Sequence, residues 1–151
     1  MEHRKSFPRF PLFLDLTGRL CVVVGGGAVG ARRAGVLAQF GAAVRVIDPA
    51  PVPLPPGVEH LPRAYRPGDL SGAALAVAAT GDRAVNRAVG EEARALGIPV
   101  SVADRHEECT FFFPAVCLAG GLSAGVVSQG EDHHKTARAA RAIREVLEEL
   151  P

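Results

Sequence analysis

The sequence lacks an excess of charge of either sign. Its 17 basic and 16 acidic side chains leave a formal net charge of +1. A chain this close to neutral has no global field to attract nucleic acid or an anionic membrane, so an anionic ligand must be held by local groups. We therefore expect neither nucleic acid nor a membrane among its partners.

Cysteines are few, and long apolar runs are missing. The three cysteines are an odd number without the C-x-x-C spacing, which fits a reducing compartment. No apolar run reaches about 18 residues, and no basic leader with an apolar core and cleavage site opens the chain. These features predict a cytoplasmic protein. At 151 residues the chain is about one domain long, which favours a single site.

The chain does contain short apolar runs that alternate with helical patterns. Helical spacing covers residues 28–40 and 83–96, and a glycine follows each pattern. The runs that have the character of strands lie at residues 20–24, 43–47, 58–65, 73–78 and 98–103. This alternation predicts an α/β fold of the Rossmann type, a doubly wound parallel sheet with right-handed crossovers.

The pattern changes after Asp104. Residues 110–128 form two apolar segments around Gly120 and Gly121, which predicts an antiparallel β-hairpin. Residues 132–150 carry Ala137, Ala140, Ile143, Val146, Leu147 and Leu150 on one face of an expected helix. A hairpin and one helix cannot fold alone, so they must pack on the first part or on a second subunit. We expect a Rossmann domain at 1–109 and a dimerisation segment at 110–151.

Glycines at 25, 27 and 30 form G-x-G-x-x-G between the first expected strand and the first expected helix. In that context the first glycine permits a tight turn, the second admits a pyrophosphate, and the third lets helix and strand pack closely. Free amides at the helix N-terminus would face the phosphates. The alternative is a glycine-rich turn in an α/β domain that binds no ligand.

Two strand ends carry further cofactor candidates. Asp48 ends the second expected strand, where an acid accepts hydrogen bonds from the ribose hydroxyls of NAD and repels the 2'-phosphate of NADP. NAD is therefore the expected cofactor, although Asp48 could also be a plain turn residue. Ala79 and Thr80 end the fourth expected strand with small side chains that leave room for a ligand, as an ordinary strand-to-helix turn would also do.

Several segments in order resemble one known family. They are "LFLDLTGRLCVVVGGGAVGARRAGVLAQFGAAVRVIDP", "LAVAATGDRAVNRAV", "GIPVSVADRHEECTFFFPA" and "LSAGVVSQG", and the similarity runs from about Phe13 to Gly130. They are similar to the precorrin-2 dehydrogenase family, which includes the N-terminal module of siroheme synthase. The resemblance implies a Rossmann-domain homodimer that uses NAD to oxidise precorrin-2 to sirohydrochlorin, and some members of the family also insert ferrous iron.

The resemblance also implies residue roles. Asp104 takes the place of the essential aspartate, and Asp48 falls near the adenosine ribose. The positions implied to contact the cofactor are Gly25, Gly27, Ala28, Val29, Gly30, Ala79 and Thr80. The positions implied to bind the substrate are Pro114, in the family's "FPA" element, and Ser128, Arg138 and Arg141. Both arginines suit the carboxylates of a tetrapyrrole.

The residues themselves are compatible with a catalytic role for Asp104. It ends the fifth expected strand and is followed by the charged segment "RHEE". Dehydrogenation of a reduced tetrapyrrole sends a hydride to NAD and releases a proton, so one carboxylate that acts as general base is the minimum protein chemistry. An aspartate at a strand end is also a common helix cap or loop residue.

The sequence departs from the family pattern near its end. Gln129 replaces an expected glycine, "EDHHK" replaces an expected serine-proline, and the further helical domain of many members is absent. These departures put iron insertion in doubt, and we predict no metal site. His133 and His134 are adjacent and would point about 100° apart on a helix, which suits a polar helix start better than a shared metal.

Two other functions stay open. A nucleotide-sensing regulatory domain would need no general base, and a tetrapyrrole carrier or chelatase would need no NAD. The "FFFPA" segment and the hairpin argue against the regulatory domain.

Overall fold

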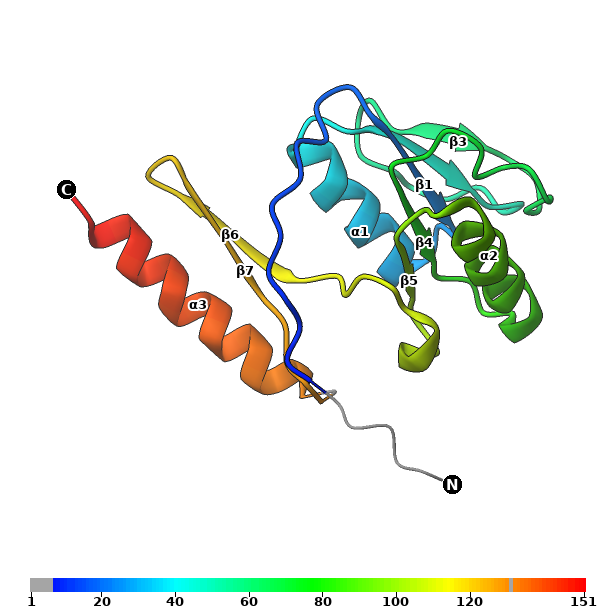
Figure 1. Ribbon diagram of the computed structural model, residues 1–151. Coiled ribbons are helices and arrows are strands. Elements are labelled where there is room, and N and C mark those ends of the chain that lie inside the picture. The colour runs from blue at the N-terminus through cyan, green and yellow to red at the C-terminus, as the bar shows by residue number, and fades with distance from the viewer. Residues whose placement is uncertain (1–6, 131) are drawn as a thin grey trace. The chain divides into compact units, whose positions relative to one another are not determined.

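The computed structural model describes residues 7–130 and 132–151, which belong to two compact units (Figure 1). One unit spans residues 14–112. The other contains residues 113–151 together with the start of the chain, of which residues 7–13 are described. The sequence analysis placed the boundary after Cys109 and the whole N-terminal segment in the first domain. The structure places the boundary after Phe112 and groups residues 7–13 with the second unit.

The first unit is the expected doubly wound α/β fold. Its elements in chain order are β1 (Leu20–Val24), α1 (Ala28–Gln39), β2 (Ala43–Ile47), β3 (Glu59–Leu61), β4 (Leu75–Ala78), α2 (Arg83–Leu96), β5 (Val100–Val102) and a short 3-10 turn, η1 (His106–Glu108). The five strands are parallel in the order β3-β2-β1-β4-β5. All the strands and helices predicted for this unit are confirmed, although β3, β4 and β5 are shorter than expected.

Side chains of β1 point alternately to the two helical layers. Val22 and Val24 belong to the core cluster that contains Val89 of α2. Val23 lies on the other face, where its Cγ1 would be 3.5 Å from a Cβ added at Gly30 of α1. Both faces of β1 are therefore covered, which explains why its sequence is a continuous apolar run and not an alternating one.

The chain changes direction across the sheet between β1 and β4. From β1 it proceeds outward through β2 to β3, and it then returns to the other side of β1 as β4 and continues to β5. Parallel α/β sheets bind ligands at the carboxyl ends of the two strands beside such a switch point. The fold therefore locates the candidate site at the ends of β1 and β4.

The second unit contains the expected hairpin and helix. Its elements are β6 (Ala115–Ala119), β7 (Leu122–Val126) and α3 (His133–Glu149). Gly120 and Gly121 form the turn with φ of 59° and 75°, a conformation that favours glycine at both positions. Within the unit, the Cys117 thiol donates to the carbonyl of Ala140 (2.9 Å), and Nη2 of Arg144 donates to the carbonyl of Val116 (3.2 Å).

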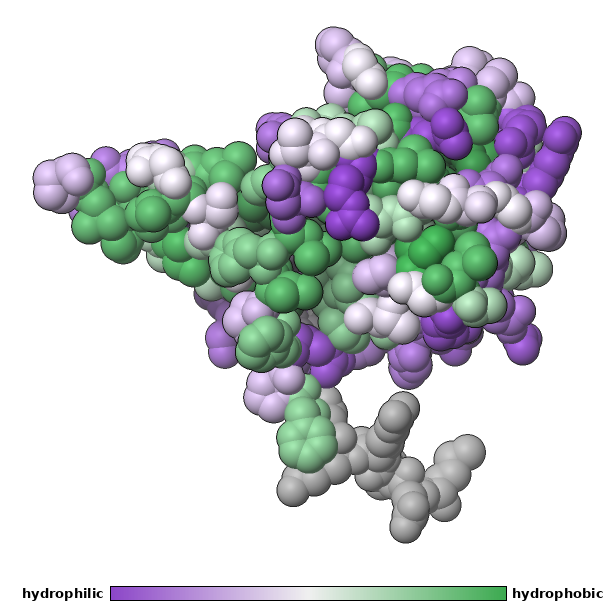
Figure 2. All heavy atoms as spheres, turned by 45° about the horizontal axis from the view of Figure 1, so that its top comes forward, coloured by the Kyte–Doolittle hydropathy of each residue, from purple (hydrophilic) through white to green (hydrophobic). Residues whose placement is uncertain are grey.

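The apolar face predicted for α3 is only partly covered. Ala140, Ile143 and Leu147 are half-buried, whereas Ala137, Val146 and Leu150 are exposed, so the hairpin alone does not cover the whole predicted face. Two short strands are too narrow to cover the whole stripe of a helix. Leu118 and Leu122 on the hairpin are exposed as well, and apolar residues interrupt the polar surface in Figure 2. Among the described residues, no helix has the length and hydropathy needed to cross a membrane.

Asp69 organises the segment that leads into β4. Its two carboxylate oxygens accept hydrogen bonds from Nη1 and Nη2 of Arg63, each at 2.9 Å, and Oδ2 also accepts from the backbone N–H of Arg66 at 2.7 Å. The Arg63 guanidinium, with help from the N–H of Arg66, holds the pKa of Asp69 below its usual value. The folded state therefore favours the ionised carboxylate.

We predict that Asp69→Asn lowers the free energy of unfolding near neutral pH. The folded pKa lies below that of the unfolded chain, so the contribution of Asp69 is present above about pH 4 and is lost as the pH falls through the folded pKa. Urea unfolding followed by circular dichroism should show a clear gap in the free energy of unfolding between wild type and variant at about pH 7, and this gap should shrink steadily as the pH is lowered below about 4. A gap that keeps its size as the pH falls would contradict this account.

Candidate functional site

Two glycines of the G-x-G-x-x-G motif, Gly25 in the loop between β1 and α1 and Gly30 in α1, are required by close backbone contacts. Gly25 has φ +103°, and an added Cβ would lie 2.4 Å from the carbonyl oxygen of Ala79 and 2.8 Å from the nitrogen of Thr80. A Cβ on Gly30 would lie only 1.8 Å from the carbonyl oxygen of Gly25. The loop thus lies against the end of β4, and α1 lies against the loop.

Gly27 differs because the space above it is open. A Cβ built on this residue would meet no atom within 4 Å. Gly27 is also the N-cap of α1, no side chain caps the helix, and no acidic residue lies in its first turn. The first amides of a helix have no partner within the helix and carry a partial positive charge. The amides at Ala28 and Val29 can therefore receive an anion, and the open Gly27 fits the approach of a pyrophosphate.

Asp48 follows β2 and lies beside the glycine loop. Its Oδ2 accepts a hydrogen bond from the N–H of Gly26 at 2.6 Å, and its Oδ1 accepts from the N–H of Ala50 at 2.8 Å. The Asp48 carbonyl lies 2.9 Å from Nε2 of His60 on β3. The structure therefore brings together the acid and the glycines that the sequence analysis selected separately.

The end of β4 forms the other side of the switch point. The N–H of Ala79 donates to the carbonyl of Val24 at 2.8 Å. This bond holds the start of the turn at residues 79–81 against the end of β1. Thr80 is held by the buried side chain of Asn86 on α2, which accepts from the Thr80 N–H at 3.0 Å and donates to the Thr80 carbonyl at 3.0 Å. The sequence analysis did not select Asn86. The one feature of the sequence that could have indicated Asn86 is that a polar residue stands on the apolar face of the expected helix.

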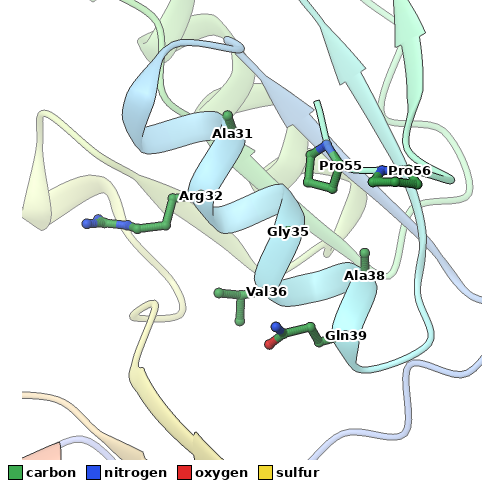
Figure 3. Close-up of a pocket in the computed structure, with 8 residues that line it drawn as sticks. All are labelled: Ala31, Arg32, Gly35, Val36, Ala38, Gln39, Pro55 and Pro56. Carbon is green, nitrogen blue, oxygen red and sulfur yellow. The ribbon is translucent and has the colours of Figure 1, made fainter. Parts of the chain in front are cut away.

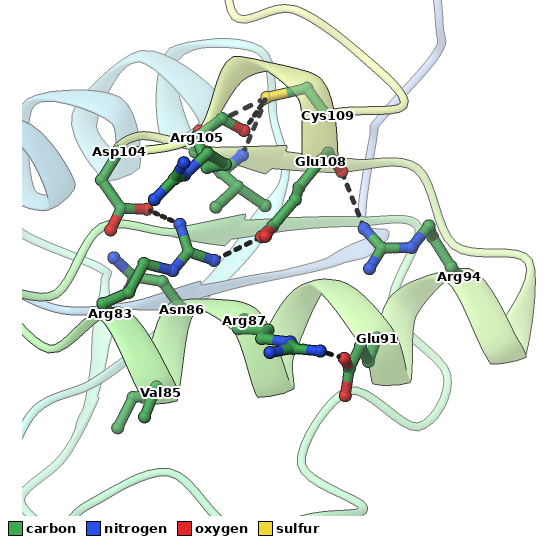
Figure 4. Close-up of polar contacts among 12 residues, drawn as sticks. Arg83, Val85, Asn86, Arg87, Glu91, Arg94, Asp104, Arg105, Glu108 and Cys109 are labelled. Atoms are coloured by element: carbon green, nitrogen blue, oxygen red, sulfur yellow. Dashed lines mark hydrogen bonds and ion pairs between the residues drawn. The ribbon is translucent and has the colours of Figure 1, made fainter. Parts of the chain in front are cut away.

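Asp104 follows β5 at the same edge of the sheet, and its neighbour Ala103 donates its N–H to the carbonyl of Ala78 at 2.9 Å. Nη1 of Arg83, from the first turn of α2, donates to Oδ1 of Asp104 at 2.8 Å (Figure 4). Nη2 of the same guanidinium contacts Oε2 of Glu108 in η1. The Asp104 side chain remains 37% exposed. The sequence gives no sign of this arginine bridge, because its partners lie far apart along the chain.

The arrangement offers a carboxylate that is anchored at one oxygen. Arg83 contacts the carboxylates of both Asp104 and Glu108, and Nη1 of Arg94 donates to the carbonyl of Glu108 at 2.8 Å. Oδ2 of Asp104 accepts no hydrogen bond in the part of the chain that the structure describes. An oxygen of this kind can take a proton from a ligand while the arginine fixes the rest of the group.

The four residues implied to bind the substrate all lie in the second unit. Arg138 and Arg141 are exposed on α3, Ser128 donates its hydroxyl to the carbonyl of Gly130, and Pro114 packs beside Gly125. Their roles stay predictions. Within residues 7–130 and 132–151, no three His, Cys, Asp or Glu side chains are grouped to hold a metal ion.

A hollow on the side of α1 is separate from the glycine loop. It is lined by Arg32, Gly35 and Val36 of the helix and by Pro55 and Pro56 of the proline-rich connection (Figure 3). None of the residues implied to contact the cofactor lines it. It therefore contributes nothing to the site at the switch point.

Comparison with known sequences identifies the family of the first unit and its flanks. A family described as "Putative NAD(P)-binding" matches residues 12–115, more than half of the chain. The chain belongs to this NAD(P)-binding family. Membership agrees with the open Gly27, the uncapped start of α1 and the position of Asp48.

Two individual relatives show which proteins this chain is similar to. The chain is 37% identical over 150 residues to "Probable multifunctional siroheme biosynthesis protein HemA" of Ruminiclostridium josui, with 93% of this chain and 28% of that protein covered. It is 42% identical over 126 residues to siroheme synthase of Methylobacillus flagellatus, with 80% of this chain and 27% of that protein covered. The chain thus spans less than a third of these relatives.

A solved structure extends the similarity to three dimensions. The chain resembles "SirC, precorrin-2 dehydrogenase" with a TM-score of 0.70 and 26% sequence identity, covering 91% of this chain and 71% of that one. The resemblance to the precorrin-2 dehydrogenase family that the motifs indicated is thereby confirmed.

We predict that Gly27→Ala impairs dinucleotide binding without harming the fold. The methyl group meets no protein atom within 4 Å but occupies the approach of the pyrophosphate. Calorimetric titration with NAD⁺ should show affinity reduced by about tenfold or more, while the melting temperature stays close to that of wild type.

Gly30→Ala is the matched comparison for this test. Its Cβ would lie 1.8 Å from a backbone oxygen, so this variant should lose stability as well as binding. Wild-type affinity for NAD⁺ in Gly27→Ala would contradict the location of the phosphates.

Proposed function

We propose that this protein oxidises precorrin-2 to sirohydrochlorin in siroheme biosynthesis, with NAD as the electron acceptor. The main support for the proposal is that the glycine loop, Asp48 and Asp104 lie at the same edge of the sheet. The chain is also similar to a precorrin-2 dehydrogenase over most of its length. The siroheme synthases among its relatives support the same pathway.

The first unit supplies the cofactor site in this proposal. Amides at the start of α1 hold the pyrophosphate, and Asp48 accepts hydrogen bonds from the adenosine ribose. When bound, the nicotinamide ring accepts a hydride from the substrate. The Asp48 carboxylate would repel the 2'-phosphate of NADP, which is why we propose NAD.

Asp104 is the proposed general base. It takes the proton that the tetrapyrrole loses together with the hydride, through the carboxylate oxygen that Arg83 does not contact. The ion pair with Arg83 opposes rotation of the carboxylate and keeps the negative charge in place before substrate arrives.

The second unit supplies groups of a different kind. We propose that Arg138 and Arg141 bind carboxylates of the substrate, that Ser128 and Pro114 line the same binding surface, and that the protein works as a homodimer in the cytoplasm. Leu118 and Leu122 on the hairpin and Val146 and Leu150 at the end of α3 are exposed, and they support association of this unit with a second subunit because exposed apolar side chains that gather on one surface mark interaction sites. Ferrous iron insertion is not part of the proposal.

The direct test is an anaerobic assay of the purified protein with precorrin-2, followed by absorbance with and without NAD⁺. The proposal predicts sirohydrochlorin only when NAD⁺ is present. Tight dinucleotide binding without oxidation would instead indicate a nucleotide-sensing domain. Tetrapyrrole binding or metal insertion that needs no NAD⁺, again without oxidation, would indicate a tetrapyrrole carrier or chelatase.

We predict that Asp104→Asn lowers kcat for precorrin-2 oxidation by about 100-fold or more, because the amide keeps the size of the side chain and cannot accept the proton. The dissociation constant for NAD⁺ should stay close to that of wild type. Glu108→Gln is the matched control, since it removes the other carboxylate on Arg83, and its loss of activity should be far smaller. Equal losses in both variants would exclude the assigned role of Asp104.

Cofactor choice gives a second prediction. Asp48→Ser removes the carboxylate that repels a 2'-phosphate, so the preference for NAD over NADP, measured as the ratio of kcat/KM values, should fall by about tenfold. Glu59→Gln on β3 alters an exposed carboxylate that pairs with Arg45 and should leave the ratio unchanged. An unaltered ratio in Asp48→Ser would show that Asp48 does not select the cofactor.

A further inference from the structure

Asn86 is a buried polar side chain for which neither the motif nor the proposed chemistry provides a role. It lies in the first half of α2, is 0% exposed, and shares the buried face of this helix with Val89, Gly90 and Ala93. An uncharged amide in such a place is costly unless it is hydrogen-bonded, so its partners indicate what it does.

All the hydrogen bonds that the structure gives the side chain of Asn86 join it to one residue, Thr80. Its Oδ1 accepts from the Thr80 N–H at 3.0 Å and from the Thr80 hydroxyl at 2.6 Å, and its Nδ2 donates to the Thr80 carbonyl at 3.0 Å. The carboxamide therefore pairs with both backbone groups of Thr80, as a neighbouring strand would, and both lone pairs of Oδ1 are used.

Thr80 in turn borders the glycine loop. A Cβ added to Gly25 would lie 2.8 Å from the backbone nitrogen of Thr80 and 2.4 Å from the carbonyl oxygen of Ala79. A small movement of the 79–81 turn would thus push into the glycine loop or open a gap beside it. Among the described residues, Ala79 is the last of this turn to hydrogen-bond a strand, through Val24 of β1, so Asn86 supplies Thr80 with the contact that a strand would otherwise supply.

We propose that Asn86 is a positioning residue for the dinucleotide, which holds the 79–81 turn in its binding conformation before the cofactor arrives. Asn86 does not touch the cofactor. Because the wall of the site is already ordered, binding does not have to order it, and the affinity is higher as a result. This proposal rests on the dinucleotide site of the proposed function and not on the identity of the substrate.

The first test compares two variants of α2 in the full chain. Asn86→Ala leaves the backbone of Thr80 without partners, whereas Val89→Ala removes apolar contacts of another fully buried residue of the same helix. Both should lower the melting temperature. Only Asn86→Ala should weaken NAD⁺ binding in calorimetric titration, by about tenfold. Unchanged affinity in Asn86→Ala, or equal loss in both variants, would reduce Asn86 to a structural residue and overturn the proposal.

The second test uses wild-type protein and does not depend on the folding of a variant. Hydrogen exchange of the Thr80 amide, measured by NMR, should be slow without NAD⁺ and change little when NAD⁺ is added, because the turn is already fixed. Fast exchange that slows only on addition of NAD⁺ would contradict the proposal. Both tests omit precorrin-2, so a failure here is distinct from a failure to produce sirohydrochlorin.

Discussion

The close packing of α1 against the glycine loop determines where a ligand can bind in the first unit. Gly30 of α1 lies so near the carbonyl of Gly25 that an added Cβ would be 1.8 Å from that oxygen. Only a residue without a side chain lets the helix begin this close to the end of β1. As a result the N-terminus of α1 opens onto the switch point of the sheet, and Asp48 reaches the N–H of Gly26 from the neighbouring strand.

The two helices of this unit differ in how their N-termini are capped. Asp82 caps α2 with its own carboxylate, which accepts from the N–H groups of Ala84 and Val85. Gly27 caps α1 with no side chain at all. An anion is therefore attracted to α1, whereas the first turn of α2 is already satisfied and serves instead to position Arg83 and Asn86. The helix that lacks a cap is the one that can bind phosphate, and the capped helix organises the residues around it.

Much of this arrangement follows from the sequence because it depends on local patterns. Valine-rich runs predicted β1 and β2, and the glycine spacing together with Asp48 predicted the cofactor side of the site. Contacts between distant segments could not be predicted, because no local pattern encodes them. Arg83 reaches Asp104 only after β5 pairs with β4, and Asn86 reaches Thr80 only once α2 turns back on the sheet. The exposure of Val146 and Leu150 also escaped prediction, since the periodicity of α3 does not reveal how little the hairpin covers.

The central claim is that a dinucleotide binds with its phosphates at the start of α1. It is tested most directly by titrating NAD⁺ into isotope-labelled protein and following backbone amide shifts by NMR. The claim predicts that the largest changes occur at Gly26, Gly27, Ala28 and Val29, with smaller changes at Asp48 and Thr80. Changes confined to the hollow beside Gly35 and Pro55, with the glycine loop unaffected, would contradict it.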